Sequence, residues 1–377
     1  MMSSHQAGTA PDPTAERAIG RLADLVSVET PSGHAPGLSA VHDALTAWAP
    51  PGLGAPERVV RDGVPHLYWP GDGAPGGVLL LGHADTVWPL GTLAAWPFTR
   101  DGDHLSGPGV FDMKAGLVIA LDALERAGDL RRGLGHVRLL VTGDEETGSR
   151  TSRDLIEDAA RDCAAVLVLE PADGDAAKVA RKGAGFYRLA VDGRAAHAGL
   201  EPETGVNALV ELAHQVIAVN GLGDGGLGTT VTPTVAQAGT TSNTVPEAAH
   251  VNIDVRAWDK AELERVDEAL RSLTARHPEA SLRVSGGVNR PPLERALSAG
   301  LLETARRVAG AHGLPAVGEA RVGGASDGNF TAALGVPTLD GLGARGDGAH
   351  ARHEWVDARS LGQRATLVAG LIEALRP

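Results

Sequence analysis

The chain has 377 residues, of which 43% are hydrophobic, and its 34 Lys and Arg against 47 Asp and Glu give a net charge of −13. This length allows two or three domains, each with a core of its own. The excess of negative charge disfavours nucleic acids and anionic membranes as partners, because the field over most of the surface would repel phosphate groups.

Cysteine usage and apolar runs narrow the class of protein further. Cys163 is the only cysteine, which excludes an internal disulfide, and its apolar surroundings predict a small core residue. No apolar stretch approaches the roughly 20 residues that span a membrane. The N-terminus has neither the basic start nor the apolar core of a secretory signal. We therefore expect a cytoplasmic protein without a membrane partner.

The first half of the chain alternates helical and strand patterns. Predicted helices cover 14–30, 38–48 and 113–127, and predicted buried strands cover 78–81, 136–149 (with acids at its C-terminal end) and 164–170. A Gly- and Pro-rich loop over 89–114 is expected to be irregular. Because acidic residues collect where the strands end, we predict an α/β domain with an open, mostly parallel sheet and a site at its carboxyl edge.

The pattern changes from about Gly185. Predicted strands and helices then follow in the order βαββαβ, over 185–193, 204–220, 230–238, 250–256, 260–276 and 281–286. Asp259 and Glu262 have the spacing of a capping box at the start of the second helix. This order is that of the ferredoxin-like fold. We therefore expect an inserted domain, 184–292, between two parts of the α/β domain, 1–183 and 293–377.

Acids and imidazoles at strand ends or in Gly-rich loops form the candidate site. His83 leaves the first buried strand, and Asp85 can meet its imidazole and fix the tautomer, because alternate residues of an extended chain project to the same side. The other members come from four further segments and are Asp112, Glu145, Glu146, Glu170, His350 and His353. Imidazoles with several carboxylates suit Zn²⁺, with Co²⁺ or Mn²⁺ as alternatives.

These residues also have ordinary structural interpretations. His83 alone could be a histidine satisfied in a turn, and Asp112, which follows GPGVF and precedes a helix, could be an N-cap. The adjacent Glu145 and Glu146 favour a site, because neighbouring side chains diverge, so that one can bind metal while the other faces substrate. Convergence of several such segments on one sheet edge is the reason to prefer a metal site.

Seven motifs resemble those of a known family. GHADTVWP, GPGVFDMKAG, TGDEETGS, LEPA, GRAAHAG, GGASDGNF and GAHARHEWV are similar, in the same order, to motifs of the co-catalytic zinc exopeptidases and deacylases. That family includes glutamate carboxypeptidase, acetylornithine deacetylase and succinyl-diaminopimelate desuccinylase. The motifs span most of the chain, and RKGAGFY, SNTVP, NIDVR and GGASDGNF are nearest to the glutamate carboxypeptidase branch.

The resemblance implies two zinc ions per chain. The implied ligands are His83 and Glu170 at one ion, Glu146 and His350 at the other, and Asp112 as the bridge. Asp85 would hydrogen-bond His83, and Glu145 would be the general base. The family spacing, a histidine four residues before Glu-aromatic-Val, selects His350 over His353.

The resemblance also assigns residues of the inserted domain, which would act as lid and dimerisation domain. His197, otherwise a surface-turn histidine, matches a family histidine that reaches the tetrahedral oxyanion from the partner subunit. Arg256 and Asn243 match positions that hold the substrate's carboxylate or scissile carbonyl. Lys182 and Arg290, at the domain junctions, either bind a second carboxylate or form ordinary hinge salt bridges.

The expected function is hydrolysis of an amide bond beside a free carboxylate, in a small peptide or N-acyl amino acid, by a homodimer. Carboxypeptidase activity is the first expectation and N-acyl-amino-acid deacylation the second. GASDG, at 324–328, also matches the serine nucleophile elbow with Ser326, but the apolar run before it is short and the acids stay unexplained. A non-catalytic binding module is disfavoured because all five implied ligands and Glu145 are present.

Overall fold

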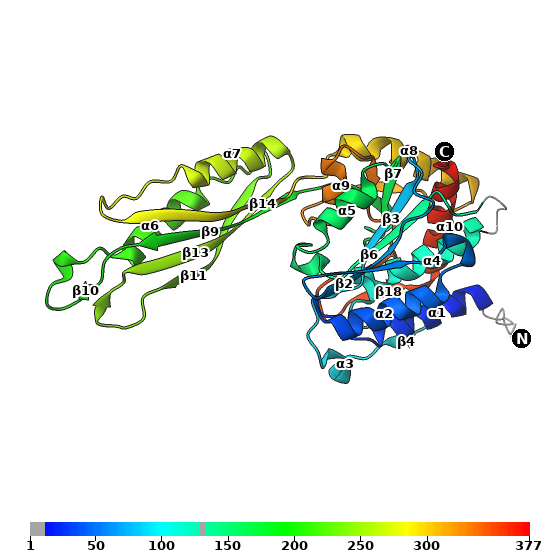
Figure 1. Ribbon diagram of the computed structural model, residues 1–377, viewed down its shortest axis with the longest axis horizontal. Coiled ribbons are helices and arrows are strands. Elements are labelled where there is room, and N and C mark those ends of the chain that lie inside the picture. Colours follow the sequence, from blue (N-terminus) through cyan, green and yellow to red (C-terminus); the bar gives the residue numbers. More distant parts are fainter. Residues whose placement is uncertain (1–11, 129–132) are drawn as a thin grey trace, which may run out of the picture. The chain divides into compact units, whose positions relative to one another are not determined.

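The computed structural model of the chain describes residues 12–128 and 133–377 (Figure 1). Residues 1–11, for which the sequence predicts no secretory signal, lie outside the described residues. The chain divides into two compact units. The first unit comprises the chain up to Val179 with Ala296–Ala320 and Phe330–Pro377, and the second unit comprises Ala180–Arg295 with Arg321–Asn329.

The segment Arg321–Asn329 belongs to the second unit, although its neighbours along the chain belong to the first. The side-chain amide of Asn329 donates hydrogen bonds to the backbone oxygens of Lys182 and Pro291, at 3.2 and 2.7 Å. The sequence places this segment in the second part of the α/β domain, 293–377. Such long-range side-chain contacts leave no periodic pattern in a sequence, which explains the difference.

A six-stranded sheet of order β1-β2-β6-β3-β7-β16 forms the centre of the first unit. Its strands are β1 (Glu57–Arg61), β2 (Val64–Trp69), β3 (Val78–His83), β6 (Val137–Thr142), β7 (Ala165–Val168) and β16 (Thr338–Leu339). The last four run parallel to one another, and β1 and β2 are antiparallel at one edge. Strand β3 is buried along its whole length, as its apolar run predicts. The expected open, mostly parallel α/β sheet is thus confirmed.

Helices cover both faces of this sheet. Val78 and Leu80 of β3 pack in one cluster with the helices α1 (Pro13–Val26), α2 (Ala35–Trp48), α4 (Ala115–Gly128), α8 (Arg295–Ala311) and α10 (Ala358–Ala374). Leu79 and Leu81 face the other way and pack with α5 (Arg153–Ala160) and with Phe330 of α9 (Gly328–Ala333). Alternate residues of a strand bury both faces, which is why the strand sequence is apolar without interruption.

A second, small sheet of the first unit has the order β17-β18-β5-β4. Its strands are β4 (Thr99–Asp101), β5 (His104–Ser106), β17 (Gly346–Asp347) and β18 (Trp355–Asp357). The sequence predicts an irregular loop over 89–114, and this part of the prediction is wrong. Strand β5 pairs with β18, which brings the segment before Asp112 beside the segment after His350.

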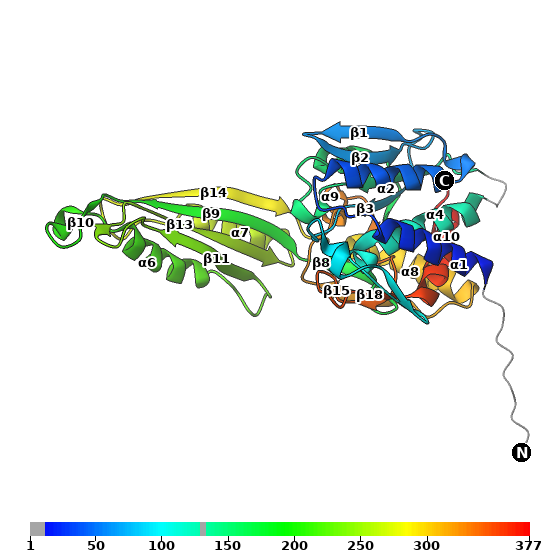
Figure 2. The same cartoon turned by 90° about the horizontal axis from the view of Figure 1, so that it is seen from below.

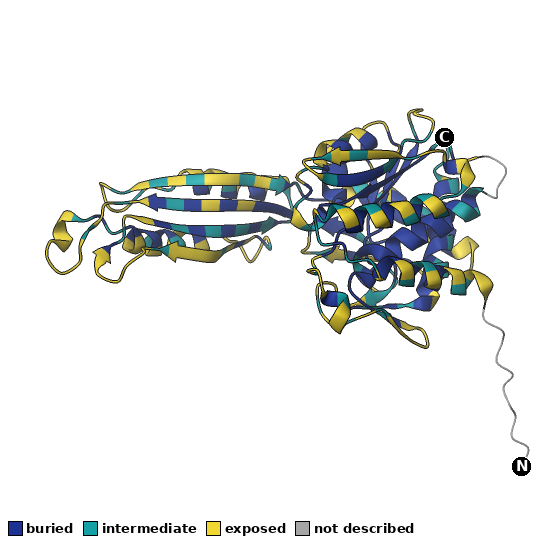
Figure 3. Cartoon of the chain, turned by 60° about the horizontal axis from the view of Figure 1, so that its bottom comes forward, coloured by how far each residue is buried: buried dark blue, intermediate teal, exposed yellow. Residues whose placement is uncertain are grey.

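The second unit has the predicted ferredoxin-like arrangement. Its strands form an antiparallel sheet of order β11-β13-β9-β14, built from β9 (Gly183–Asp192), β11 (Thr230–Ala238), β13 (Ala248–Ala257) and β14 (Ser281–Arg290). Helices α6 (Ala208–Asn220) and α7 (Lys260–Arg271) contribute to one core with the buried side of this sheet. Figure 2 shows these strands, and Figure 3 shows the alternation of buried and exposed residues along them. Asp259 caps α7 by accepting a hydrogen bond from the Glu262 N–H at 2.9 Å, as predicted.

The remaining elements are short. They are η1 (Pro51–Leu53), α3 (Thr92–Ala95), η2 (Val110–Lys114), η3 (Glu145–Thr147), β8 (Ala176–Arg181), β10 (Ala196–His197), η4 (Pro202–Thr204), β12 (Thr244–Val245) and β15 (Gly318–Val322). Within 12–128 and 133–377, none of the helices combines the length and the apolar content needed to cross a membrane.

Candidate metal centre

Three parallel strands of the first unit end at the same edge, and each leads into candidate ligands. His83 is the last residue of β3, Glu145 and Glu146 follow the end of β6, and Glu170 follows the end of β7. The strand register pairs His83 with Thr142, so the ends of β3 and β6 are level. Parallel strands in register bring their carboxyl ends together, which is the basis for predicting a site at this edge.

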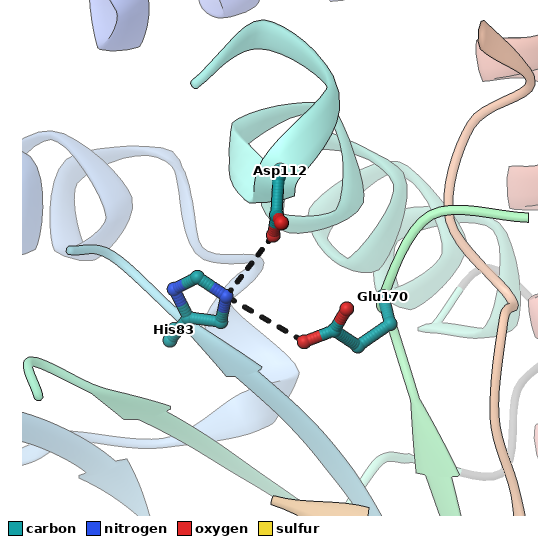
Figure 4. Close-up of side chains that lie close together, drawn as sticks. All are labelled: His83, Asp112 and Glu170. Atoms are coloured by element: carbon teal, nitrogen blue, oxygen red, sulfur yellow. Dashed lines mark ion pairs between the residues drawn. The ribbon is translucent and has the colours of Figure 1, made fainter. Parts of the chain in front are cut away.

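His83, Asp112 and Glu170 form the first of two groups whose ligand atoms all lie within 4.8 Å of one another. Nε2 of His83 is 3.3 Å from Oδ1 of Asp112 and 3.6 Å from Oε1 of Glu170. Figure 4 shows this single ring nitrogen facing both carboxylates. The three side chains are 2%, 13% and 10% exposed, so the group is largely shielded from bulk water.

Asp112, Glu146 and His350 form the second group. Nε2 of His350 is 3.2 Å from Oδ2 of Asp112 and 3.0 Å from Oε2 of Glu146. Asp112 therefore presents one carboxylate oxygen to each group. His350 has a φ of 63°, in the left-handed region that side chains other than glycine rarely adopt. His353, the alternative histidine of this motif, is exposed and belongs to neither group.

The donor atoms of the first group fit a cation. Nδ1 of His83 is 3.0 Å from the backbone oxygen of Asp85 and 3.3 Å from its Oδ1, so Nδ1 donates to Asp85 and Nε2 is the nitrogen left to bind a cation, either a proton or a metal ion. Among the described residues, Nε2 of His83 and Oδ1 of Asp112 are buried without a hydrogen-bond partner. Two buried electron-pair donors that face each other without a shared hydrogen bond suit a bound metal ion, and Zn²⁺ accepts this nitrogen and oxygen set.

The pKa shifts of the cluster show how strongly it attracts positive charge. Burial lowers the pKa of His83, but the carboxylates of Asp112, Asp85 and Glu170 raise it, and the net shift is well upward. Asp112 and Glu146 raise the pKa of His350 to about 10. Burial raises the pKa of Asp112, yet the imidazoles of His350 and His83 hold it below its usual range. A cluster with this surplus of carboxylate charge favours cations.

Two buried carboxylates behind the cluster fix the turn that carries Glu145 and Glu146. Asp85 accepts hydrogen bonds from the backbone N–H groups of both residues, each at 3.1 Å. Asp144 accepts from the backbone N–H and the hydroxyl of Thr151, at 2.7 and 2.8 Å. Asp144 is not among the predicted site residues, although the sequence shows it as a third acid directly before the glutamate pair.

His197, the last residue of β10, and Asn243, directly before β12, lie on neighbouring segments of the second unit. The backbone oxygen of Asn243 accepts a hydrogen bond from the N–H of Ala198 at 2.9 Å, and both predicted side chains are exposed. Nδ1 of His197 accepts hydrogen bonds from the backbone N–H groups of Gly199 and Leu200, each at 3.1 Å. The neutral imidazole therefore carries its proton on Nε2, where it can be donated to a ligand.

Arg256 extends from β13 of the second unit with its guanidinium partly exposed. It binds Asp254 through two hydrogen bonds of 2.9 Å. Its guanidinium carbon also lies 5.4 Å from the centre of the Phe186 ring. The predicted carboxylate-binding group is thus preorganised on a strand and already holds a carboxylate of its own chain.

Lys182 and Arg290 have the contacts of structural residues within the second unit. Lys182 donates a hydrogen bond to the backbone oxygen of Gly228. Arg290 is 6% exposed and forms an ion pair with Asp327 at 3.0 Å. Of the two interpretations that the sequence leaves open, these contacts favour the salt-bridge and hydrogen-bond role over the binding of a substrate carboxylate.

Ser326 does not have the environment of a nucleophile elbow. It is fully buried, and its hydroxyl accepts a hydrogen bond from the N–H of Gly328 at 3.2 Å. Its own N–H donates to Oδ1 of Asn329 at 2.9 Å. A nucleophile elbow exposes its serine, so this geometry argues against the serine-hydrolase alternative.

Most of the chain matches one protein family. Residues 79–374 match the family described as peptidase family M20/M25/M40. The chain belongs to this family. Carboxypeptidase G2 of Pseudomonas sp. (strain RS-16) is 34% identical to it over 379 residues, covering 94% of this chain and 88% of that protein. Succinyl-diaminopimelate desuccinylase 2 of Shewanella loihica is 32% identical over 215 residues, covering 52% of this chain and 56% of that protein.

A solved M20 structure shows the same fold. The YXEP protein of Bacillus subtilis, described as a dinuclear metal-binding peptidase from the M20 family, aligns with a TM-score of 0.64 at 16% identity, covering 97% of this chain and 99% of that chain. The resemblance noted from the motifs is thus confirmed, as is the fold class. As an M20 protein, the chain is a peptidase or amidohydrolase of a metal-dependent family.

Proposed function

We propose that this M20 protein is a two-metal exopeptidase that hydrolyses the amide bond beside the free carboxylate of a small peptide, as a glutamate carboxypeptidase does. One observation carries the proposal: the two oxygens of Asp112 lie 3.3 Å from His83 and 3.2 Å from His350. A carboxylate in this position can bridge two cations. Each group adds one further carboxylate, Glu170 or Glu146, and Zn²⁺ suits this set, with Co²⁺ or Mn²⁺ as alternatives.

The metal ions and Glu145 would act together to activate the attacking water. Two divalent cations held by these groups would lower the pKa of a water molecule and polarise the amide carbonyl. Glu145, which is 8% exposed and has its backbone N–H held by Asp85, takes the proton of the attacking water and passes it to the departing amine. Burial of Glu145 keeps bulk water from competing for that proton.

His197 supplies a hydrogen bond to the oxyanion that forms during the attack. Its tautomer supports this role, because Nδ1 is occupied by two backbone N–H donors and Nε2–H is left as the donor. We assign this contact to the His197 of a partner subunit, following the family resemblance. A preorganised donor of this kind stabilises the transition state more than the ground state.

Arg256 and Asn243 are the residues that we assign to substrate binding. The planar guanidinium of Arg256 suits bidentate binding of a carboxylate, and its side chain is 27% exposed. Asn243 lies next to the His197 loop and would hold the scissile carbonyl. Lys182 and Arg290 serve the junctions of the second unit, where their hydrogen bond and ion pair already engage them.

N-acyl-amino-acid deacylation is the second candidate. It uses the same ligands and the same general base, and it is supported by the desuccinylase of Shewanella loihica, which matches 52% of this chain. The carboxypeptidase assignment comes first because carboxypeptidase G2 matches 94% of the chain. In both reactions the amide nitrogen belongs to the released amino acid. The reactions differ in the group on the carbonyl side, which is an amino-acid residue in a peptide and a simple acyl group in an N-acyl amino acid.

We propose that the protein acts as a homodimer joined through the second unit. Helix α6 exposes Leu209, Val210 and Ile217, whose residues are 49%, 53% and 73% exposed. Strand β11 is the edge of the sheet beside this helix, and Val235 on it is 51% exposed. A second copy would cover both features. Light scattering is expected to give twice the chain mass, and Ile217→Asp is expected to reduce it to that of a monomer.

Metal removal and a substrate screen test the proposed function. The purified protein is treated with a chelator, dialysed, and assayed with Zn²⁺, Co²⁺ or Mn²⁺ against dipeptides and N-acyl amino acids, with released amino acid as the readout. We expect loss of activity on chelation, recovery on adding metal, and the highest rates on peptides with a C-terminal acidic residue. Preference for an acetylated or succinylated amino acid would favour the deacylase instead.

Two further outcomes would contradict the proposal. Activity that survives chelation but is lost on treatment with a serine-directed reagent would support the serine hydrolase based on Ser326. Binding of substrates without turnover at any metal concentration would support a non-catalytic binding module.

A further inference from the structure

Glu354 is a fully buried acid whose carboxylate accepts hydrogen bonds along the segment that leads into Asp112. Oε1 accepts from the backbone N–H of Phe111 at 2.8 Å and from that of Asp112 at 2.9 Å. Oε2 accepts from the backbone N–H of Gly109 at 3.0 Å and from Nε1 of Trp88 at 3.2 Å. An ionised carboxylate accepts hydrogen bonds at both oxygens and donates none, so one carboxylate can satisfy these four donors together.

These contacts join three segments that carry candidate ligands. Trp88 lies shortly after His83, the Gly109 turn ends in Asp112, and Glu354 itself lies shortly after His350. The turn between His350 and Glu354 is closed by a hydrogen bond from the Glu354 N–H to the backbone oxygen of Ala351, at 3.0 Å. One side chain therefore holds the backbone of Asp112 in place relative to the segments of the two imidazoles.

The Gly109 turn also lies close to the segment that follows His83. Gly109 has a φ of 74°, and a Cβ there would lie 2.5 Å from Cγ2 of Thr86. The backbone thus approaches the segment that follows His83 as closely as it can. Glu354 accepts hydrogen bonds from the N–H groups of this turn, so it ties down the backbone that carries the Asp112 carboxylate.

We propose that Glu354 is a positioning residue for Asp112, and that it sets the metal affinity of both groups at once. This inference rests on the proposed function, since it takes Asp112 as the ligand shared by two cations. Residues that orient metal ligands from behind change metal affinity by about 10- to 100-fold when they are replaced. The hydrogen bond that Glu354 accepts from Asp112 comes from the backbone N–H of Asp112, so Glu354 acts on both groups through one peptide segment.

The test compares Co²⁺ binding by the full-length protein and two matched variants. Glu354→Gln keeps the size of the side chain but turns an amide NH₂ toward backbone donors. Glu211→Gln is the control, because Glu211 is 2% exposed and accepts from the N–H groups of Arg276 and His277, at 3.0 and 2.9 Å, in the second unit. Metal-free protein is titrated with Co²⁺, followed by its visible absorption and by calorimetry, without substrate.

We expect Glu354→Gln to weaken Co²⁺ binding by about 10- to 100-fold at both sites and to change the visible spectrum. Glu211→Gln is expected to lower thermal stability and to leave Co²⁺ affinity within about twofold of the original protein. If Glu354→Gln does not fold, Trp88→Phe removes one of the four donors and is expected to weaken binding by several-fold.

Three results would overturn the inference. If Glu354→Gln folds and binds two Co²⁺ ions as tightly as the original protein, Glu354 is not a positioning residue, but the proposed function is unaffected. Equal weakening in Glu211→Gln would show that loss of any buried carboxylate has the same effect. If the unaltered protein does not bind Co²⁺, the proposed function is wrong, and the inference that rests on it is wrong as well.

Discussion

The carboxylate of Asp85 accepts a hydrogen bond from the backbone N–H of Glu145 at 3.1 Å. The same buried side chain accepts from the N–H of Glu146 and from the hydroxyl of Ser32, at 3.1 and 2.6 Å, and its Oδ1 lies 3.3 Å from Nδ1 of His83. Asp85 thus links a proposed ligand at the end of β3 to the proposed base and a second ligand after β6. Its position explains how residues from two strands keep a fixed geometry.

Asp85→Asn is expected to lower both metal affinity and kcat by about 10- to 100-fold, because the amide cannot accept from His83 and the glutamate turn together. Bound metal by mass spectrometry and steady-state rates measure the two effects. Ser32→Ala is the matched control, since it removes one donor to Asp85 and leaves the others. Equal effects of the two substitutions would contradict the role of Asp85.

Glu145→Gln is expected to lower kcat by about 10²- to 10⁴-fold, because the amide cannot take a proton from water. The metal content should stay unchanged, since Glu145 belongs to neither group of ligands. Rates and metal content are measured on the same preparation, with Glu157→Gln, a partly exposed glutamate of α5 paired with Arg153, as the control. Full activity of Glu145→Gln would exclude the proposed mechanism.

Asp112→Ala and Glu170→Ala are expected to differ in the number of ions lost. Asp112 faces both groups, so its removal should abolish tight binding at both, whereas Glu170 belongs to the first group alone. Metal stoichiometry after dialysis decides between the outcomes. Retention of one tightly held ion by Asp112→Ala would show that the carboxylate does not bridge.

His197→Ala is expected to lower kcat by about 10²- to 10³-fold without changing metal content, as for loss of one oxyanion donor. Mixing this variant with Glu145→Gln after dissociation tests whether His197 acts across a dimer. Random reassociation places one intact site in half of the dimers, so about one quarter of the original activity should return. No recovery, in dimers shown to have exchanged, would place His197 in its own subunit's site.

Stability is expected to fall on acidification through His42. This residue is 1% exposed, and burial, with smaller effects from the charges of Arg58 and His66, lowers its pKa from 6.5 to about 4. The unfolded chain then binds more protons than the folded one between these values, so stability is full above pH 6.5 and is lost as the pH falls toward 4. The free energy of unfolding should drop by about 3 kcal/mol from this residue.

Denaturant unfolding at several pH values measures this loss. His42→Gln should flatten the pH dependence over that window, whereas the exposed His312→Gln should leave it unchanged. A slope that is the same in His42→Gln as in the original chain would assign the acid sensitivity to other groups.

Local patterns in the sequence were sufficient to predict most helices and strands and the residue types of the proposed metal ligands. The apolar run at 78–81 predicts a strand buried on both faces, and β3 is buried throughout, because hydrophobicity and strand period act within a few residues. The capping role of Asp259 is equally local. His83 and the acids at strand ends stand out for the same reason, since parallel strands bring their ends to one edge.

Tertiary structure alone decided which atoms meet. The two oxygens of Asp112 face different imidazoles, Glu354 binds a turn more than 240 positions away in the chain, and Asn329 draws its segment into the second unit. The partners of Lys182 and Arg290, which are the backbone oxygen of Gly228 and the carboxylate of Asp327, are likewise not indicated by the sequence. Hydrogen bonds and ion pairs depend on distances of a few ångströms between groups remote in sequence, and these distances are set by packing of the whole chain and by no local period.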